Sequence, residues 1–318
     1  MLLCGTQCKF FFFLCVLCAF FVFFVVNGFW ISDFWPALFL AFEQICNNFI
    51  YAIMKTAVIT GGTRGIGAGL VKDFLKLGWN VSYSGTTDSS VEKSLSLFSE
   101  NYKSESIRAF KCDVTLEKDL ISLWDNSIKA FGQVDIWVNN AGTASDQVVF
   151  NKIPVEVFMK IIDTNVKGLM LATHIVYNRM VGHGFGAIYN MEGLGSDGRT
   201  IYGLLPYGTS KRAVRYFTEG FAKEVKDGSV ILGTLQPGMV LTDLLLDPLR
   251  NNPPNKKQMI RLYNLLANDV DTVTPFLVKK MTENKKNGAK IAWLTSRKVM
   301  MKFLMSPFSG RDVVSKYM

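Results

Sequence analysis

Tyr207 and Lys211 stand four residues apart in the run Tyr-Gly-Thr-Ser-Lys, and together they could carry acid–base chemistry. In a helix this spacing places two side chains on the same face, one turn apart. A phenol is a poor acid–base group near neutral pH because its free pKa is about 10, and a neighbouring cation favours the phenolate. The pair therefore predicts a proton donor whose pKa the lysine lowers toward neutrality. Tyr51 and Lys55 share the spacing but precede the first expected strand, so position in the chain is what makes the pattern informative.

A glycine-rich run follows the apolar segment 55–60, which is typical of a buried parallel strand. An amphipathic helix ending at Gly78 comes next. Glycines let the backbone approach a phosphate, and a helix N-terminus offers unpaired N–H groups and a positive dipole. Strand, glycine turn and helix in this order predict a dinucleotide-binding site. The residues expected to form it are Gly61, Thr63, Arg64, Gly65, Ile66 and Gly67.

Five motifs occur in order between residues 55 and 297, and together they resemble the short-chain dehydrogenase/reductase family. They are the glycine run, Asn139-Asn140-Ala141-Gly142 after another expected buried strand (134–138), Asn165, Tyr207 with Lys211, and Pro237-Gly238 with Thr242. The resemblance implies a doubly wound Rossmann fold of α/β class. It implies a mainly parallel seven-stranded sheet in the order 3-2-1-4-5-6-7, with the site at the carboxyl edge.

The same resemblance assigns roles to the matching residues. Tyr207 would protonate the oxyanion that hydride transfer leaves on a carbonyl, Lys211 would hold the nicotinamide ribose, and Asn165 would fix a water that feeds protons to the lysine. Besides the glycine run, the residues implied to bind the cofactor are Asp113, Asn140, Ala141, Gly142, Tyr207, Lys211, Pro237, Gly238, Val240 and Thr242.

The family's active-site serine is missing from its usual place. Aligned through Asn190, Glu192 and Gly193 occupy the two serine positions, and Ser196 comes three residues later. Ser196 is the predicted catalytic substitute. The alternative is the Glu192 carboxyl, which would need a raised pKa near the substrate. The sequence leaves this choice open.

The preferred nicotinamide is predicted from the end of the second strand (80–84). NAD enzymes usually carry an acid there for the ribose 2′-hydroxyl. Here the strand ends in Gly85-Thr86-Thr87, and Asp88 comes a few residues late. Arg64 lies in the glycine loop, where a guanidinium suits a 2′-phosphate. We therefore expect NADPH in preference to NADH, unless Arg64 is only a solvated loop charge.

Within the family, the run Asn-Met-Glu-Gly-Leu-Gly-Ser (190–196) resembles the chlorophyll b reductase branch, as do 235–246, 276–281 and 288–303. That branch implies NADPH-dependent reduction of the 7-formyl group of chlorophyll b by a membrane-associated enzyme. A generic ketone or 3-oxoacyl reductase is the alternative. The missing serine also leaves open a non-catalytic regulator that binds NADPH.

The first 53 residues differ in composition from the rest of the chain. They hold 13 of the 25 Phe and five of the six Cys, and 10–31 is uncharged and almost wholly apolar. A helix of that length can cross a hydrocarbon core of about 30 Å. We expect residues 1–53 to be a membrane anchor or targeting leader. A cleaved leader and a true start at Met54 are the alternatives.

The remaining chain is divided into a reductase domain (54–297), with 243–285 as a substrate cover, and a basic tail (298–318). Residues 249–318 hold 14 Lys and Arg against four acids, which suits either a solvated surface or anionic lipid headgroups. With His174 and His183 as the only histidines and Cys112 alone outside the leader, no metal site is expected. The expected partners are a hydrophobic carbonyl substrate and membrane lipid, with a homo-oligomer left open and no nucleic acid. The catalytic domain is expected at a membrane, on the cytosolic or stromal side, in a plastid if the source is a photosynthetic eukaryote.

Overall fold

The computed structural model describes residues 54–226, 228–251, 255–305 and 310–317. The expected anchor or leader at 1–53 lies outside these ranges. Among the helices that are described, none is long and apolar enough to cross a membrane.

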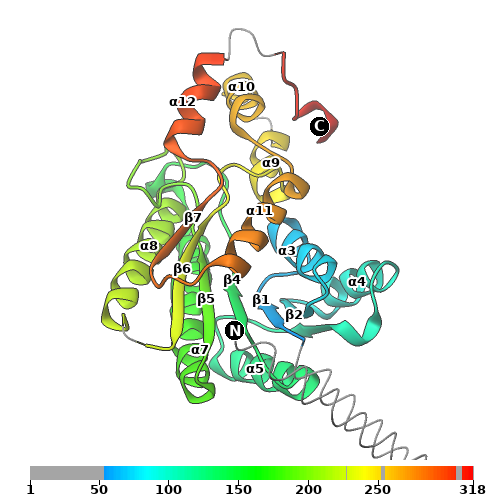
Figure 1. The fold of residues 1–318 in the computed structure, drawn as a ribbon. Helices are drawn as coiled ribbons and strands as arrows, with labels where there is room; N and C mark the ends of the chain where they lie inside the picture. The colour runs from blue at the N-terminus through cyan, green and yellow to red at the C-terminus, as the bar shows by residue number, and fades with distance from the viewer. Residues whose placement is uncertain (1–53, 227, 252–254, 306–309, 318) are drawn as a thin grey trace, which may run out of the picture. The chain divides into compact units, whose positions relative to one another are not determined.

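Seven parallel strands form one sheet in the order β3-β2-β1-β4-β5-β6-β7, as the sequence predicts (Figure 1). The strands are β1 (Thr56–Ile59), β2 (Asn80–Gly85), β3 (Ile107–Lys111), β4 (Ile136–Asn139), β5 (Gly186–Met191), β6 (Val230–Gln236) and β7 (Ala289–Ala292). β1 lies at the switch point, because the chain proceeds to β2 on one side and later to β4 on the other. Ligands of doubly wound folds bind at the carboxyl edge beside this point.

Helices cover both faces of the sheet, which explains why the central strands are almost wholly buried and mostly apolar. Helices α3 (Gly65–Lys76), α4 (Asp88–Ser99) and α11 (Val270–Glu283) pack on one face. Helices α5 (Glu117–Phe131), α7 (Leu169–His183) and α8 (Leu205–Glu224) pack on the other. The remaining elements are α6 (Val155–Ile162), α9 (Asp243–Arg250), α10 (Lys256–Leu266), α12 (Ser296–Met305), a π-helical turn η3 (Asp163–Gly168), and the short 3-10 turns η1 (Ser104–Ser106), η2 (Phe150–Lys152) and η5 (Ser315–Tyr317).

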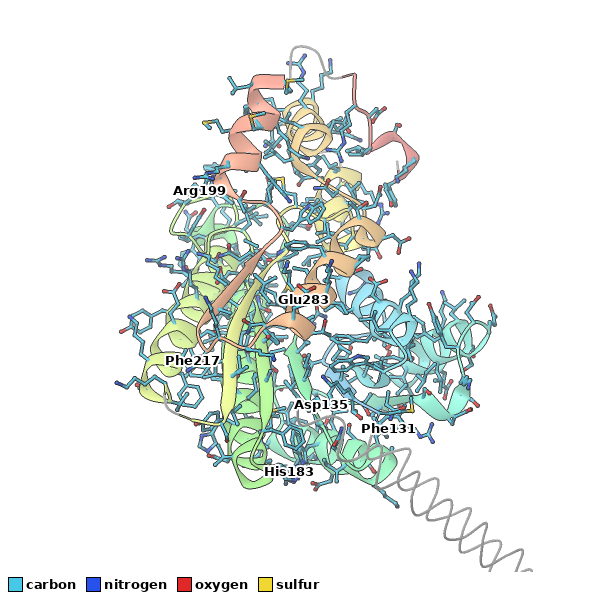
Figure 2. The ribbon with its side chains drawn as sticks, in the orientation of Figure 1. Phe131, Asp135, His183, Arg199, Phe217 and Glu283 are labelled. Atoms are coloured by element: carbon cyan, nitrogen blue, oxygen red, sulfur yellow. The ribbon has the colours of Figure 1, made fainter. Side chains whose placement is uncertain are left out.

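Labelled side chains mark the carboxyl end and the amino end of the sheet (Figure 2). Arg199, on the loop after β5, lies at the carboxyl end of the strands near α12, whereas Asp135 and His183 lie at the opposite end. The half-buried Asp135 carboxylate accepts the N–H of Thr56 at 2.8 Å, so it ties the start of β1 to the start of β4. This contact at the amino end of the sheet is therefore structural, and the candidate active site lies at the carboxyl end.

The predicted substrate cover (243–285) is only partly separate from the main domain. Helices α9 and α10 form a small core of their own, with Leu246, Leu249 and Met259. Helix α11 instead packs in the main core beside α3. The predicted boundary at 297/298 falls inside α12, and Val314 is buried in the α9–α10 core, so the described part of 298–318 is folded onto the domain.

Candidate active site

The glycine run forms a cradle at the N-terminus of α3. A Cβ placed on Gly67 would stand 2.1 Å from the carbonyl oxygen of Gly61, and one on Gly61 would stand 2.9 Å from the Cα of Ala141. Gly61 and Gly65 also have φ values of 65° and 56°, which L side chains rarely adopt. No side chain caps α3, and no acid lies in its first turn. The helix N-terminus is therefore free to receive an anion, which fits a pyrophosphate.

Thr60 and Asn140 join the ends of β1 and β4 beneath this cradle. The side-chain amide of Asn140 donates to the carbonyl oxygens of Thr60 at 2.9 Å and Gly61 at 3.0 Å. The hydroxyl of Thr60 accepts the N–H groups of Asn140 at 3.0 Å and Ala141 at 3.1 Å. Asn140 thus fixes the shape of the glycine loop. Thr60 was not among the predicted site residues, although its place between the strand and the glycines could have suggested it.

Asn165 lies in the π-helical turn η3 between α6 and α7, and it is almost fully buried. Its Oδ1 accepts the N–H of Thr143 at 2.8 Å, and its Nδ2 donates to the carbonyl of Thr143 at 2.9 Å and to the hydroxyl of Ser210 at 3.0 Å. Ser210 in turn donates to the carbonyl of Tyr207 at 2.7 Å. Asn165 therefore links the loop after β4 to the helix of the tyrosine. Its role in holding a water stays a prediction, and Ser210 was missed.

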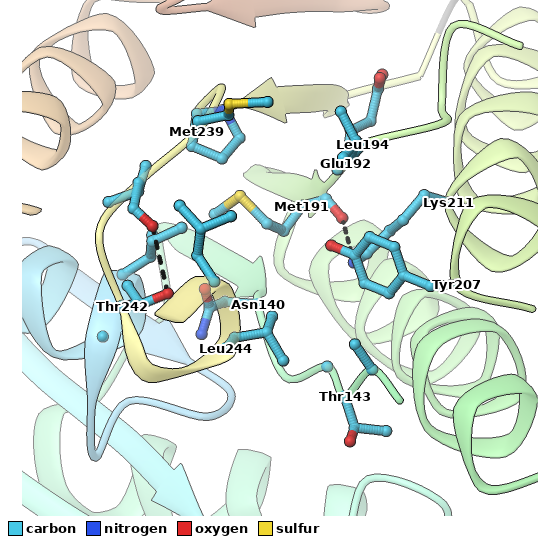
Figure 3. A pocket seen from close by; sticks show the side chains of 18 of the residues that line it. Asn140, Thr143, Met191, Glu192, Leu194, Tyr207, Lys211, Met239, Thr242 and Leu244 are labelled. Atoms are coloured by element: carbon cyan, nitrogen blue, oxygen red, sulfur yellow. Dashed lines mark hydrogen bonds between the residues drawn. The ribbon is translucent and has the colours of Figure 1, made fainter. Parts of the chain in front are cut away.

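Tyr207 and Lys211 lie beside the carboxyl ends of β4 and β5 (Figure 3). The ammonium of Lys211 lies 5.7 Å from the centroid of the Tyr207 ring and donates to the carbonyl of Met191 at 3.1 Å. A Cβ on Gly142 would stand 3.6 Å from this ammonium and 3.3 Å from Oδ1 of Asn165. The structure therefore brings the tyrosine, the lysine and the asparagine to one place.

Burial controls the titration of this pair. It raises the pKa of Tyr207 to about 12, contrary to the expected lowering, because loss of water disfavours the phenolate. It lowers the pKa of Lys211 to about 8 for the corresponding reason, and the nearby Glu192 carboxylate opposes that shift. Lys211 directs its ammonium to the Met191 carbonyl, so the described residues do not provide the phenolate stabilisation that the spacing suggested.

The position of the missing serine is now defined in space. A Cβ on Gly193 would stand 2.5 Å from the hydroxyl of Tyr207, so this glycine is the residue beside the phenol. Glu192 is buried, its Oε2 accepts the side-chain amide of Gln236, and its Oε1 has no partner among the described residues. Ser196 is also buried and lines the same cavity.

We expect carbonyl reduction by this site to fall as the pH rises through about 8, because Lys211 loses its ammonium there. Glu192→Gln removes the charge that holds the pKa of Lys211 up, so the fall should move to lower pH. The pH profile of kcat/KM measures this. The control is Glu219→Gln, which changes an exposed residue of α8, the helix that carries Lys211. It should leave the pH profile unchanged. An unshifted profile in Glu192→Gln would show that the carboxylate does not act on the lysine.

These groups open into one cavity of about 2400 Å³. Every predicted cofactor-binding residue lines it, and so do Ser196 and Glu192, whereas Asn165 lies behind its wall. At the end of β2 the lining is the neutral Gly85, Thr86 and Thr87. Asp88 is outside the lining and pairs with Lys111 at 2.8 Å. No acid from this strand end therefore faces the cavity.

Sequence comparisons identify relatives over most of the described chain. It is 32% identical to the probable chlorophyll(ide) b reductase NYC1, chloroplastic, of Arabidopsis thaliana, over 79% of this chain and 53% of that protein. It is 34% identical to the chlorophyll(ide) b reductase NOL, chloroplastic, of the same plant, over 73% of this chain and 66% of that protein. The chain thus matches about half of the first relative and just under two thirds of the second.

Solved structures share the fold. ElxO with NADP bound superposes with a TM-score of 0.67 at 24% identity, covering 76% of this chain and 97% of ElxO. A 3-ketoacyl-(acyl-carrier-protein) reductase from Brucella melitensis complexed with NADH gives a TM-score of 0.66 at 24% identity, covering 77% and 98%. Residues 55–251 match the family described as short chain dehydrogenase. The ordered motifs, the sheet order and this match agree: the chain belongs to the short-chain dehydrogenase/reductase family.

Proposed function

We propose that the chain is an NADPH-dependent reductase that converts a hydrophobic aldehyde or ketone to the alcohol, with the 7-formyl group of chlorophyll b as its substrate. The observation that carries the reductase proposal is the convergence of the Tyr207 hydroxyl, the Lys211 ammonium and the α3 cradle on one cavity. The chlorophyll substrate is supported by the names of the relatives and by the Asn-Met-Glu-Gly run that replaces the serine strand.

NADPH, when bound, supplies a hydride to the carbonyl carbon. The α3 cradle would hold its pyrophosphate, and Lys211 its nicotinamide ribose. Tyr207 donates its phenolic proton to the carbonyl oxygen, so that hydride and proton together make the hydroxyl group. Burial keeps Tyr207 protonated, which prepares the site for reduction; the reverse oxidation would need the disfavoured phenolate.

Arg64 is the residue proposed to select NADPH. It is exposed at the cavity, and its guanidinium makes no hydrogen bond or ion pair with any residue the structure describes. Arg64→Ala should raise the Kd for NADPH at least about tenfold and leave that for NADH nearly unchanged, because a charge-assisted contact to the 2′-phosphate is lost. Titration of each cofactor by fluorescence measures both constants. An equal loss for both cofactors would contradict the assignment.

A large hydrophobic substrate suits the volume and the lining of the cavity. Its volume of about 2400 Å³ exceeds the roughly 300–1,000 Å³ of ordinary ligand pockets. Apolar side chains from α9, α10 and α12 contribute to its lining: Leu244, Leu245, Met259, Leu262 and Phe303. This leaves room for a macrocycle beside a dinucleotide.

As part of the same proposal, the enzyme works at a plastid membrane with its catalytic domain on the stromal side. The chloroplastic relatives and the apolar composition of residues 1–53 support this. Fractionation tests it: the full chain should stay with membranes after a carbonate wash.

The substrate assignment is tested by following NADPH oxidation with chlorophyll b, a 3-oxoacyl thioester and simple aldehydes. Turnover of chlorophyll b with a hydroxymethyl product is the expected result. Turnover of the 3-oxoacyl thioester alone would favour a generic reductase. NADPH binding without turnover of any compound would favour a regulator.

A further inference from the structure

Helix α12 presents its apolar side chains to solvent. None of its residues is buried, and its large apolar residues other than Val299 are between 52% and 64% exposed. These residues are Met300, Met301, Phe303, Leu304 and Met305. A contiguous apolar surface of this kind on a soluble domain usually marks an interaction site.

The two lysines of α12 make contacts with the neighbouring parts of the protein. Lys302 donates to the carbonyl of Leu265 on α10 at 3.2 Å, and the ammonium of Lys298 lies 4.1 Å from the ring of Trp293. A surface helix normally packs its apolar side on the core and turns its charges outward. α12 instead leaves its large apolar side chains exposed, so they need a covering that the described chain does not provide.

The charges around this apolar face indicate what kind of surface covers it. Helix α10 packs beside α12, and neither carries an acid: α10 has Lys256, Lys257 and Arg261, and α12 has Arg297 besides the two lysines that contact the protein. A second copy docked here would bring like charges together, which is unfavourable. An apolar strip among cations instead complements a bilayer with anionic headgroups.

The face also adjoins the cavity. Met300 and Phe303 of α12 and Leu262 of α10 line it, at the end of the molecule opposite α5 and α7 (Figure 1). A surface that docks here would therefore meet the mouth of the site.

We propose that α12 and the basic helix α10 dock onto an anionic lipid bilayer, with the apolar side chains of α12 inserted at the headgroup boundary. Docking deepens the membrane location given in the proposed function, but it does not depend on the proposed reaction. Delivery of a lipid-dissolved substrate to the cavity is the consequence that rests on that function.

Hydrogen exchange of the full chain in vesicles tests the docking. The full chain, with residues 1–53, is reconstituted in two kinds of vesicle. One is phosphatidylcholine alone, and the other is phosphatidylcholine with about one-third phosphatidylglycerol. Amides of α12 should exchange at least about tenfold more slowly in the anionic vesicles, and the exposed helix α4 should exchange equally in both. High salt should weaken the protection.

Two pairs of exposed substitutions serve as variant and control. Met301→Glu with Leu304→Glu should abolish the protection, whereas Leu97→Glu with Tyr216→Glu, on α4 and α8, should preserve it. Equal exchange of α12 in the two vesicle types would overturn the proposal. Protection that is already complete in detergent would overturn it too, because another part of the chain or a second copy would then cover the helix.

Discussion

Tyr207→Phe is expected to lower kcat/KM for carbonyl reduction by about a thousandfold, within the range typical of lost general acid catalysis. The phenolic hydroxyl lies beside Gly193 in the cavity, and it makes no hydrogen bond with the described residues that its loss would break. The ring should therefore stay where it is. The Kd for NADPH should change by less than about twofold, so the defect should lie in kcat.

The matched control is Tyr216→Phe, an exposed position on the same helix α8. It should retain full activity. Single-turnover rates at saturating NADPH separate the proton-transfer defect from weaker binding. If Tyr207→Phe kept more than about a tenth of the wild-type rate, another group, with Ser196 and Glu192 as the first candidates, would have to supply the proton.

The sequence was sufficient for the parts of the site that depend on local spacing. The strand–glycine–helix order placed the cradle at the N-terminus of α3, and the four-residue spacing placed Lys211 beside Tyr207. The sheet order followed from the family resemblance and is confirmed. Each of these needs only a short stretch of chain or a known topology.

The contacts that sequence reasoning missed join segments far apart in the chain. Gln236 meets Glu192 because β5 and β6 pair in a register that brings their carboxyl ends together. Ser210 meets Asn165 through the packing of α8 against the π-helical turn. The raised pKa of Tyr207 likewise depends on burial, which spacing does not report.

The missing serine shows the same limit most clearly. Alignment placed Glu192 and Gly193 at the serine positions, but it could not say which of them faces the phenol. In the structure Gly193 does, and a Cβ there would also stand 3.1 Å from Cγ and 3.2 Å from Cε of Lys211. The glycine is therefore required for space, and a serine could not simply be restored.

Gly193→Ala should accordingly lower kcat by about a hundredfold, because the added Cβ, 2.5 Å from the Tyr207 hydroxyl, must displace that hydroxyl by a fraction of an ångström or more. Gly193→Ser, which recreates the family's residue type, should be no more active. Gly220→Ala on α8 is the control, since its Cβ would meet nothing within 4 Å, and it should leave kcat nearly unchanged and raise the thermal midpoint slightly. Steady-state kinetics with NADPH titration measures the effect on chemistry apart from cofactor binding. A Gly193→Ser variant faster than wild type would contradict the prediction, because it would mean that the site had room for the serine and gained from its hydroxyl.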